Sequence, residues 1–209
     1  FRSVEGGSVY FGTGSDDFSI RCCNASTGAS EWAFPTDSTV ASSPAVVGDQ
    51  VYCVSEDGNI YCLDALTGSL MWNRTIGVHI DSSPAVVNGR VYIGSDDNKV
   101  YCLGANTGSI LWNYTTGGIV ASSPAVADGK VYVGSHEQKI YCLDAVSGAH
   151  IWDCKIGNLL SEGYGFTSSP AVADGKVYVG SEENGLYCLD ATTGSQLWNY
   201  SAGGWMDSS

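Results

Sequence analysis

The side chains of this sequence that could bind a metal ion or transfer protons are three histidines and a series of acidic pairs. The histidines, His79, His136 and His150, stand at three different positions of the repeat described below, so the sequence predicts no zinc cluster. The acidic pairs lie in short polar segments: Asp16-Asp17, Glu56-Asp57, Asp96-Asp97, His136-Glu137 and Glu182-Glu183. A ring of such segments could bind Ca²⁺, but solvated turns are the simpler interpretation, and we expect no metal site.

Other catalytic motifs are absent from the sequence. It contains no Cys-x-x-Cys, no phosphate-binding glycine loop and no nucleophile elbow, so we predict no catalytic residues. With 22 acidic and 9 basic residues the net charge is −13, which argues against binding to nucleic acid or to an anionic membrane surface. No run of eighteen apolar residues is present, and we therefore expect no membrane insertion.

The elements that position these residues follow from an internal repeat. Two residue types recur at steps of 40, 40, 40 and 46 residues: Trp32, Trp72, Trp112, Trp152 and Trp198, and Cys22, Cys62, Cys102, Cys142 and Cys188. The sequence therefore predicts one domain, 1–209, made of five copies of one unit: 1–43, 44–83, 84–123, 124–169 and 170–209. The fourth copy carries a six-residue insertion.

Each copy is predicted to form four short β-strands. In the third copy, apolar segments rich in Val, Ile and Tyr alternate with the turn formers Asn-Gly, Asp-Asp-Asn and Thr-Gly, which predicts strands at 83–87, 90–95, 99–105 and 109–114. No window has the 3.6-residue spacing of a long amphipathic helix. A four-stranded antiparallel unit of about forty residues, repeated around an axis, is a β-propeller blade, so the predicted fold class is all-β.

The repeated residues have structural roles under this interpretation. Each Trp lies on the outermost strand and is expected to pack against the neighbouring blade, beside the small Gly of the Thr-Gly turn. Asp64, Asp144 and Asp190 precede that turn and are expected to accept hydrogen bonds from its backbone. Because the third copy has Gly104 at this position, the position is structural rather than catalytic.

The segment VYVGSEENGLYCLDATTGSQLWNY resembles the repeat of the pyrroloquinoline-quinone-type (PQQ-like) β-propeller family, in which a Val-Tyr-Val-Gly strand, a Leu-Tyr-Ala-Leu-Asp-Ala strand and a Thr-Gly turn precede Trp. The resemblance covers essentially the whole chain. It implies a propeller, but the family includes quinone dehydrogenases, outer-membrane assembly lipoproteins and cell-surface repeat proteins. Its rings commonly have seven or eight blades. We favour a closed five-bladed ring, because the last copy ends in phase with the first, and keep a fragment of a larger ring as the alternative.

A quinone dehydrogenase of this family would need PQQ, a Ca²⁺ site of carboxylate and amide oxygens, an Asp base and a Trp beneath the quinone. Enzymes of this group also carry a disulfide between adjacent cysteines, and Cys22-Cys23 is such a pair by sequence. Cys22 falls in the regular third-strand series, however, and the loops are short. We therefore favour a non-enzymatic protein without a cofactor over a PQQ- and Ca²⁺-dependent redox enzyme.

The cysteines and the sequons bear on the compartment. Five of the eight cysteines occupy the third-strand position, where a small buried side chain is expected. If Asp57-Gly58 is a two-residue hairpin turn, Cys53 lies opposite Cys62 and could form a cross-strand disulfide with it. Glycosylation sequons begin at Asn24, Asn73, Asn113 and Asn199. With the acidic composition, these features favour an extracellular or cell-envelope protein.

The segments that link one copy to the next differ most among the copies. In a propeller these links gather on one face around the central channel, where variable loops on a rigid scaffold can bind a ligand, although ordinary loop drift would also make them differ. The predicted binding rim consists of His79, Asp81, Glu162, Tyr164, Phe166, Trp205 and Asp207. The favoured function is a binding or scaffold module of a cell-surface or secreted protein that recognises protein or carbohydrate. The alternatives are the redox enzyme and an architectural unit that assembles with copies of itself.

Overall fold

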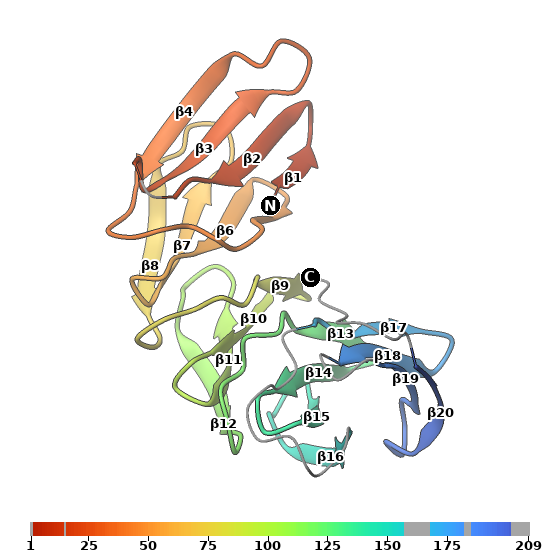
Figure 1. Cartoon of the computed structure of the whole chain (residues 1–209). Coiled ribbons are helices and arrows are strands. Elements are labelled where there is room, and N and C mark those ends of the chain that lie inside the picture. The colour runs from red at the N-terminus through yellow and green to blue at the C-terminus, as the bar shows by residue number, and fades with distance from the viewer. Residues whose placement is uncertain (1, 15, 157–167, 182–184, 202–209) are drawn as a thin grey trace.

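The protein is represented by a computed structural model that describes residues 2–14, 16–156, 168–181 and 185–201. Within these ranges the chain forms five sheets, each of four antiparallel strands in sequence order, and no helix (Figure 1). No helix that is long and apolar enough to cross a membrane occurs in the described part of the chain. The predicted all-β class and its four-stranded blades are confirmed.

We number the five sheets as blades 1 to 5 in chain order. Blade 1 contains β1 (Arg2–Glu5), β2 (Ser8–Gly12), β3 (Ser19–Asn24) and β4 (Ser30–Pro35). Blade 2 contains β5 (Ala45–Val47), β6 (Gln50–Val54), β7 (Asn59–Asp64) and β8 (Leu70–Thr75). Blade 3 contains β9 (Ala85–Val87), β10 (Arg90–Ser95), β11 (Lys99–Gly104) and β12 (Ile110–Thr115). Blade 4 contains β13 (Ala125–Ala127), β14 (Lys130–Ser135), β15 (Lys139–Asp144) and β16 (His150–Lys155). Blade 5 contains β17 (Ala171–Ala173), β18 (Lys176–Ser181), β19 (Gly185–Asp190) and β20 (Gln196–Ser201).

The turns within a blade explain why these segments pair. Asn88 and Gly89, between β9 and β10, have φ of 51° and 72°, the two positive values that a tight type I′ hairpin turn needs. Asp128-Gly129 and Asp174-Gly175 repeat this turn in blades 4 and 5. The two middle strands are buried on both faces, so apolar side chains follow one another instead of alternating with polar ones; in β10, for example, every residue from Val91 to Ser95 is buried.

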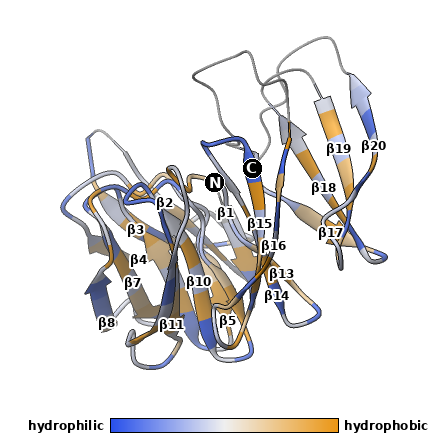
Figure 2. Ribbon diagram, turned by 90° about the horizontal axis from the view of Figure 1, so that it is seen from below, coloured by the Kyte–Doolittle hydropathy of each residue, from blue (hydrophilic) through white to orange (hydrophobic). Residues whose placement is uncertain are grey.

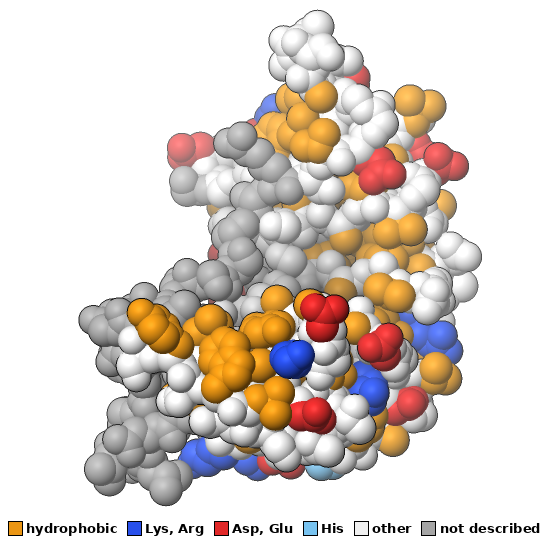
Figure 3. Space-filling view, turned by 90° about the vertical axis from the view of Figure 1, so that its right-hand side faces the viewer, with side chains coloured by type: hydrophobic (Ala, Val, Ile, Leu, Met, Phe, Trp, Pro, Cys, Tyr) orange, Lys and Arg blue, Asp and Glu red, His pale blue; other side chains and the backbone are white. Residues whose placement is uncertain are grey.

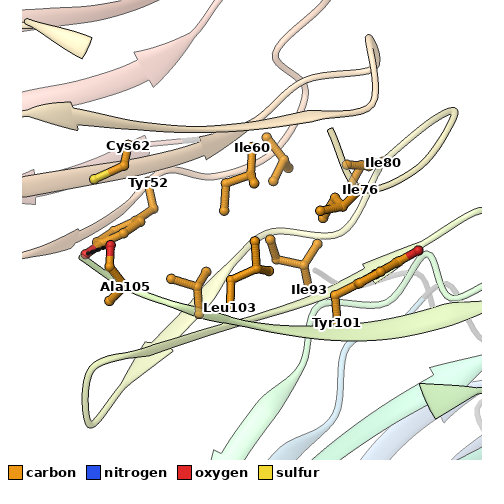
Figure 4. Packing of buried hydrophobic residues seen from close by; sticks show 11 residues of the cluster. Tyr52, Ile60, Cys62, Ile76, Ile80, Ile93, Tyr101, Leu103 and Ala105 are labelled. Carbon is orange, nitrogen blue, oxygen red and sulfur yellow. Dashed lines mark hydrogen bonds between the residues drawn. The ribbon is translucent and has the colours of Figure 1, made fainter. Parts of the chain in front are cut away.

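Successive blades are packed face to face in what we call joints. Four hydrophobic clusters lie between blades 1 and 2, 2 and 3, 3 and 4, and 4 and 5. In the second joint Tyr52 and Ile60 of blade 2 face Ile93 and Leu103 of blade 3 (Figure 4). In Figure 2 hydrophobic residues lie mainly in inner strands such as β19, whereas the outermost strands β8 and β20 are largely hydrophilic. Burial of these apolar faces is the main favourable contribution to the fold.

Each joint is anchored at its outer edge by a Trp and a Tyr. The indole Nε1 donates to an alanine carbonyl of the next blade at 2.8–3.3 Å, in the pairs Trp32–Ala65, Trp72–Ala105, Trp112–Ala145 and Trp152–Ala191. The hydroxyls of Tyr10, Tyr52, Tyr92 and Tyr132 donate to the same four carbonyls at 3.0–3.4 Å. The indole ring also covers the turn glycine of the next blade: a Cβ added at Gly68, Gly108, Gly148 or Gly194 would lie 2.5–2.6 Å from a ring carbon. The predicted packing of Trp against Gly is confirmed at all four joints.

The inner edges of the joints are connected by the Ser-Ser pairs. The backbone N–H of Ser43 donates to the hydroxyl of Ser83 at 2.9 Å, Ser83 to Ser123 at 3.0 Å, and Ser123 to Ser169 at 3.0 Å. The preceding serine of each pair is buried and binds the second strand of its own blade, as Ser122 does with the carbonyl and the N–H of Gly134 at 3.0 and 2.7 Å. Hydrogen bonds therefore run around the axis from blade to blade.

The five blades follow one another along an arc (Figure 1). The innermost strands are neighbours in the order β1, β5, β9, β13, β17, and no comparable contact joins β17 to β1. A closed ring of five and a fragment of a larger ring therefore both stay predictions.

The structure corrects the disulfide prediction. The last residues paired between β6 and β7 are Val54 and Ile60, with the five residues 55–59 between them, so the register places Cys53 opposite Tyr61 and Cys62 opposite Tyr52. Because side chains alternate along a strand, Cys53 points into the first joint and Cys62 into the second, and both thiols are free. Cys22 and Cys23 are also free and neighbours on one strand, with only Cys22 in the first joint.

Candidate functional site

The links between blades and the turns between second and third strands lie together on one face. Each of the three links that the structure describes hydrogen-bonds to the turn of the blade that follows it: Glu56 N–H donates to the carbonyl of Thr39 at 2.9 Å, and Asp96 N–H to the carbonyl of His79 at 3.2 Å. His136 N–H binds the carbonyl of Ile119 at 2.9 Å in the same way. The variable links and the acidic turns, which the sequence presented as separate features, therefore form one surface.

A cluster of four ionisable side chains occupies this surface at the second joint, and we call it the acidic rim: Glu56, His79, Asp81 and Asp96. His79 Nδ1 lies 3.3 Å from an Asp96 carboxylate oxygen and 3.7 Å from one of Asp81, while its Nε2 lies 4.0 Å from Glu56. Glu56 comes from the β6–β7 turn, His79 and Asp81 from the β8–β9 link, and Asp96 from the turn after β10. One imidazole is thus placed among three carboxylates.

The rim is half-buried, and this affects its electrostatics. The side chain of Asp96 is 23% exposed, and burial raises the pKa of its carboxyl above the ordinary value, with repulsion from Asp81 adding to the rise and the nearby His79 and His136 opposing it. His79 Nδ1 and Asp96 Oδ1 are buried atoms that make no hydrogen bond; the 3.3 Å contact between Nδ1 and the other Asp96 oxygen is an ion-pair distance only. Because three carboxylates outnumber one imidazole in any protonation state of His79, the rim attracts positive charge.

The same geometry could accept a metal ion. Ligand atoms of Glu56, His79 and Asp81 lie within 4.8 Å of one another, and among the described residues this is the one such group. Imidazole and carboxylate together suit zinc and other transition metals. A Lys or Arg side chain of a partner would meet the same three carboxylates, so the chemistry of the rim is recognition of a cation in general.

Two of the seven residues predicted for the binding rim lie in this cluster, and their role in binding stays a prediction. His79 and Asp81, predicted from the variability of the links, lie in the rim, whereas Glu162, Tyr164, Phe166, Trp205 and Asp207 are outside the described residues. Glu56 and Asp96 were missed as partners of His79. The sequence could have indicated these two residues. The turns follow the second strand of a blade and the links follow the fourth, and because these strands run in the same direction, turns and links lie on the same face.

The described residues do not fit a quinone cofactor. All five described tryptophans lie on the outermost strands β4, β8, β12, β16 and β20, so none of them is placed beneath a ligand at the axis. The adjacent Cys22 and Cys23 do not form the disulfide that the enzymes of this group carry.

The chain is similar to known proteins in sequence and in structure. The family model described as outer membrane protein assembly factor BamB matches residues 1–77, 56–155 and 136–209, which together span the chain. No curated protein matches the chain.

Solved structures give the same fold at low identity. BamB from Moraxella catarrhalis superposes with a TM-score of 0.79 and 21% identity, over 93% of this chain and 61% of that one. The computationally designed protein Ika8 gives 0.81 and 16%, over 99% and 63% of the two chains. Quinohemoprotein alcohol dehydrogenase from Comamonas testosteroni gives 0.80 and 17%, over 96% and 42%. The chain thus spans less than two thirds of the length of these proteins, and at these identities the likeness concerns the fold alone.

Proposed function

The chain belongs to the family of the outer membrane protein assembly factor BamB, with its PQQ-type repeats, and from this premise we propose that it is a non-enzymatic binding module of the cell envelope whose acidic rim holds a basic segment of a partner protein. The observation that carries the proposal is the placement of the Glu56, Asp81 and Asp96 carboxylates around His79. A rigid blade array supports the loops that present these groups, which is a common arrangement in binding proteins.

The chemistry of the partner follows from charge. The chain carries a net charge of −13, so a basic segment is attracted from a distance and the rim gives it a local docking point. A location in the cell envelope is supported by the name of the matched family and by the sequons: Asn73, Asn113 and Asn199 are exposed on outermost strands, where a glycan would be sterically allowed.

Binding of synthetic peptides to the purified chain tests the proposal. Lys- and Arg-containing peptides are expected to bind, acidic peptides of equal length are not, and affinity for the basic ones should fall with added salt. The triple variant E56Q/D81N/D96N should bind roughly tenfold more weakly, because each partly exposed ion pair contributes up to about 1 kcal/mol.

The matched control is D49N/D128N/D174N. It changes the net charge by the same amount, but its three aspartates are exposed in the turns between first and second strands, at the other end of the blades. It should bind basic peptides within about twofold of the native chain. Equal losses in the two triple variants, or no binding of any basic peptide, would count against the rim as the site. Quinone absorbance with Ca²⁺-dependent dehydrogenase activity would contradict the non-enzymatic assignment.

A further inference from the structure

The carboxylates of the acidic rim differ from the other acidic groups in their partners. Elsewhere a carboxylate pairs with a lysine, as Asp153 does with Lys139 at 3.1 Å, and acidic and basic side chains also lie side by side in the lower part of Figure 3. Among the described residues, the three carboxylates of the rim have one ion-pair partner, the imidazole of His79. The rim therefore combines an excess of negative charge with a nitrogen ligand.

The link that supplies His79 and Asp81 is held in place by buried neighbours. Ile80, between the two, is 1% exposed and packs in the second joint (Figure 4). The next residue, Ser82, is also buried, and its hydroxyl accepts a hydrogen bond from the N–H of Gly94 at 3.0 Å. Because the backbone is fixed on both sides, the side chains of His79 and Asp81 are presented together at the surface.

Three potential metal ligands converge at this link. One oxygen of Glu56, one oxygen of Asp81 and one ring nitrogen of His79 lie within 4.8 Å of one another. Ligand atoms around a tetrahedral zinc ion are about 3.4 Å apart, because Zn–N and Zn–O distances are roughly 2.0–2.2 Å. The side chains of Glu56 and Asp81 are 29% and 47% exposed, so they are free to rotate toward this spacing.

The surroundings of the imidazole determine which of its nitrogens faces an ion. Nδ1 of His79 is buried, makes no hydrogen bond and lies 3.3 Å from a carboxylate oxygen of Asp96. Nε2 faces Glu56 at 4.0 Å. A metal ion on Nε2 would keep the proton on Nδ1, from which it can be donated to Asp96, and such a carboxylate behind a metal-bound imidazole fixes the orientation of the ring. A buried nitrogen that is otherwise unsatisfied would thereby gain a partner.

We propose that Glu56, His79 and Asp81 bind a divalent transition-metal ion, of which Zn²⁺ fits the ligand set best, and that Asp96 positions the imidazole. Imidazole together with carboxylates suits zinc and related ions, whereas Ca²⁺ and Mg²⁺ are bound by oxygen ligands. The sequence did not indicate this set, because the three histidines stand at different positions of the repeat and the carboxylates come from a turn and a link that are distant along the chain.

An ion at this place would use carboxylates that are also proposed to hold a basic segment of a partner. On the basis of that proposed function, the inference adds that Zn²⁺ and the basic segment compete for the rim. Bound zinc would cancel part of the negative charge that attracts the segment, so the ion would regulate binding.

Calorimetric titration of the purified chain with zinc chloride tests the site. We expect one ion per chain, and much weaker binding of calcium. His79→Gln keeps all three carboxylates but should lower the affinity for zinc at least about 100-fold, because even the hydrogen-bond partners of a metal ligand contribute roughly 10- to 100-fold. The matched control is His150→Gln: this imidazole lies 3.0 Å from an oxygen of Asp153 and is similarly exposed, and its loss should leave zinc binding unchanged. Circular dichroism would verify that both variants fold.

Equal zinc affinity of His79→Gln and the native chain would overturn the inference, since the ion would then be held by other groups, such as the cysteine thiols or the acidic surface in general. Equal affinities of the native chain for zinc and calcium would overturn it as well, because the imidazole would then contribute nothing.

Peptide binding measured with EDTA and with saturating zinc separates this inference from the proposed function. A basic peptide should bind the native chain more weakly in zinc than in EDTA, and should bind His79→Gln equally in both, because this variant keeps the carboxylates. Peptide binding to the native chain that zinc does not change would contradict the competition. Zinc binding without any peptide binding would support the metal site and contradict the proposed function, and peptide binding without zinc binding would do the reverse.

Discussion

At the scale of single residues, the two members of an acidic pair have different roles. Asp57 and Asp97, the second members, accept hydrogen bonds from the hydroxyls of Tyr61 and Tyr101 at 2.8 and 2.6 Å. The first members, Glu56 and Asp96, face His79 in the rim. The sequence predicted solvated turns for all of these residues, because spacing alone does not reveal that the tyrosine of the following strand points back at the turn.

The aspartates before the Thr-Gly turns make stability depend on pH. Asp64 accepts hydrogen bonds from the N–H groups of Leu66 and Thr67 and from the Thr67 hydroxyl, at 2.7–3.1 Å, and these bonds lower the pKa of its carboxyl from 3.8. Thr and Ser hydroxyls and backbone N–H groups lower the pKa of Asp190 and Asp144 in the same way. Since the folded-state pKa lies below the unfolded one, the stabilisation is complete above about pH 4 and is lost as pH falls through the folded-state pKa.

The triple variant D64N/D144N/D190N should therefore unfold with a flatter pH dependence below pH 4 than the native chain, as measured by urea denaturation between pH 2 and pH 5. Asn keeps the acceptor oxygen, as Asn24 does in blade 1 with the N–H groups of Ser26 and Thr27 at 3.1 Å. The two chains should differ little at pH 7. Parallel curves for native and variant chains would show that these carboxylates do not contribute to acid unfolding.

At the scale of elements, the strands were more predictable than their register. The strands of the third copy were predicted to within two residues, because apolar runs and Asn-Gly or Thr-Gly turns mark both ends. The predicted register of β6 and β7 was wrong. Five residues, an odd number, lie between the paired Val54 and Ile60, so the register is shifted by one residue and Cys53 lies on the opposite face of the sheet from Cys62. The acidic rim combines a turn, a link and a second turn from two blades, and only the packing of the link onto both turns brings them together.

The joint between an indole and a turn glycine can be tested at one position. Gly108 has φ of +62°, and an added Cβ would lie 2.5 Å from the ring of Trp72, so Gly108→Ala should destabilise the protein by roughly 2–3 kcal/mol through backbone strain and displacement of the ring. Chemical denaturation gives the value.

Gly89→Ala is the matched control for this substitution. Gly89 has φ of +72° with nothing within 4 Å, so only the strain remains, and about 1 kcal/mol is expected. The difference between the two variants isolates the packing of the indole ring. If the two alanine variants are equally stable, the indole yields to the added methyl group and the joint is not tightly packed.

At the scale of the whole molecule, stability should depend on how many joints a blade takes part in. In a linear array of repeats each unit is stabilised by itself and by its neighbours. Blades 2, 3 and 4 each have two of the four internal joints, whereas blades 1 and 5 each have one. The sequence could not predict this difference, because the copies are nearly identical in their strands and the number of neighbours is a property of the assembled array.

Amide hydrogen exchange of the monomeric chain at low concentration should reveal this gradient. The outermost strand β20 should exchange faster than β12, although their sequences, QLWNYS and ILWNYT, are closely similar. Trp112 holds β12 against blade 4 through the Ala145 carbonyl at 3.2 Å, and Trp198 has no such partner within the described residues. The exchange rates should differ because the free energy of local opening rises with the number of joints that must be broken.

Strand β16, which Trp152 holds in the same way as Trp112 holds β12, serves as the reference and should exchange at a rate similar to β12. Equal protection of β20 and β12 in the monomer would mean that blade 5 is already covered, and the arc would then have to close within one chain.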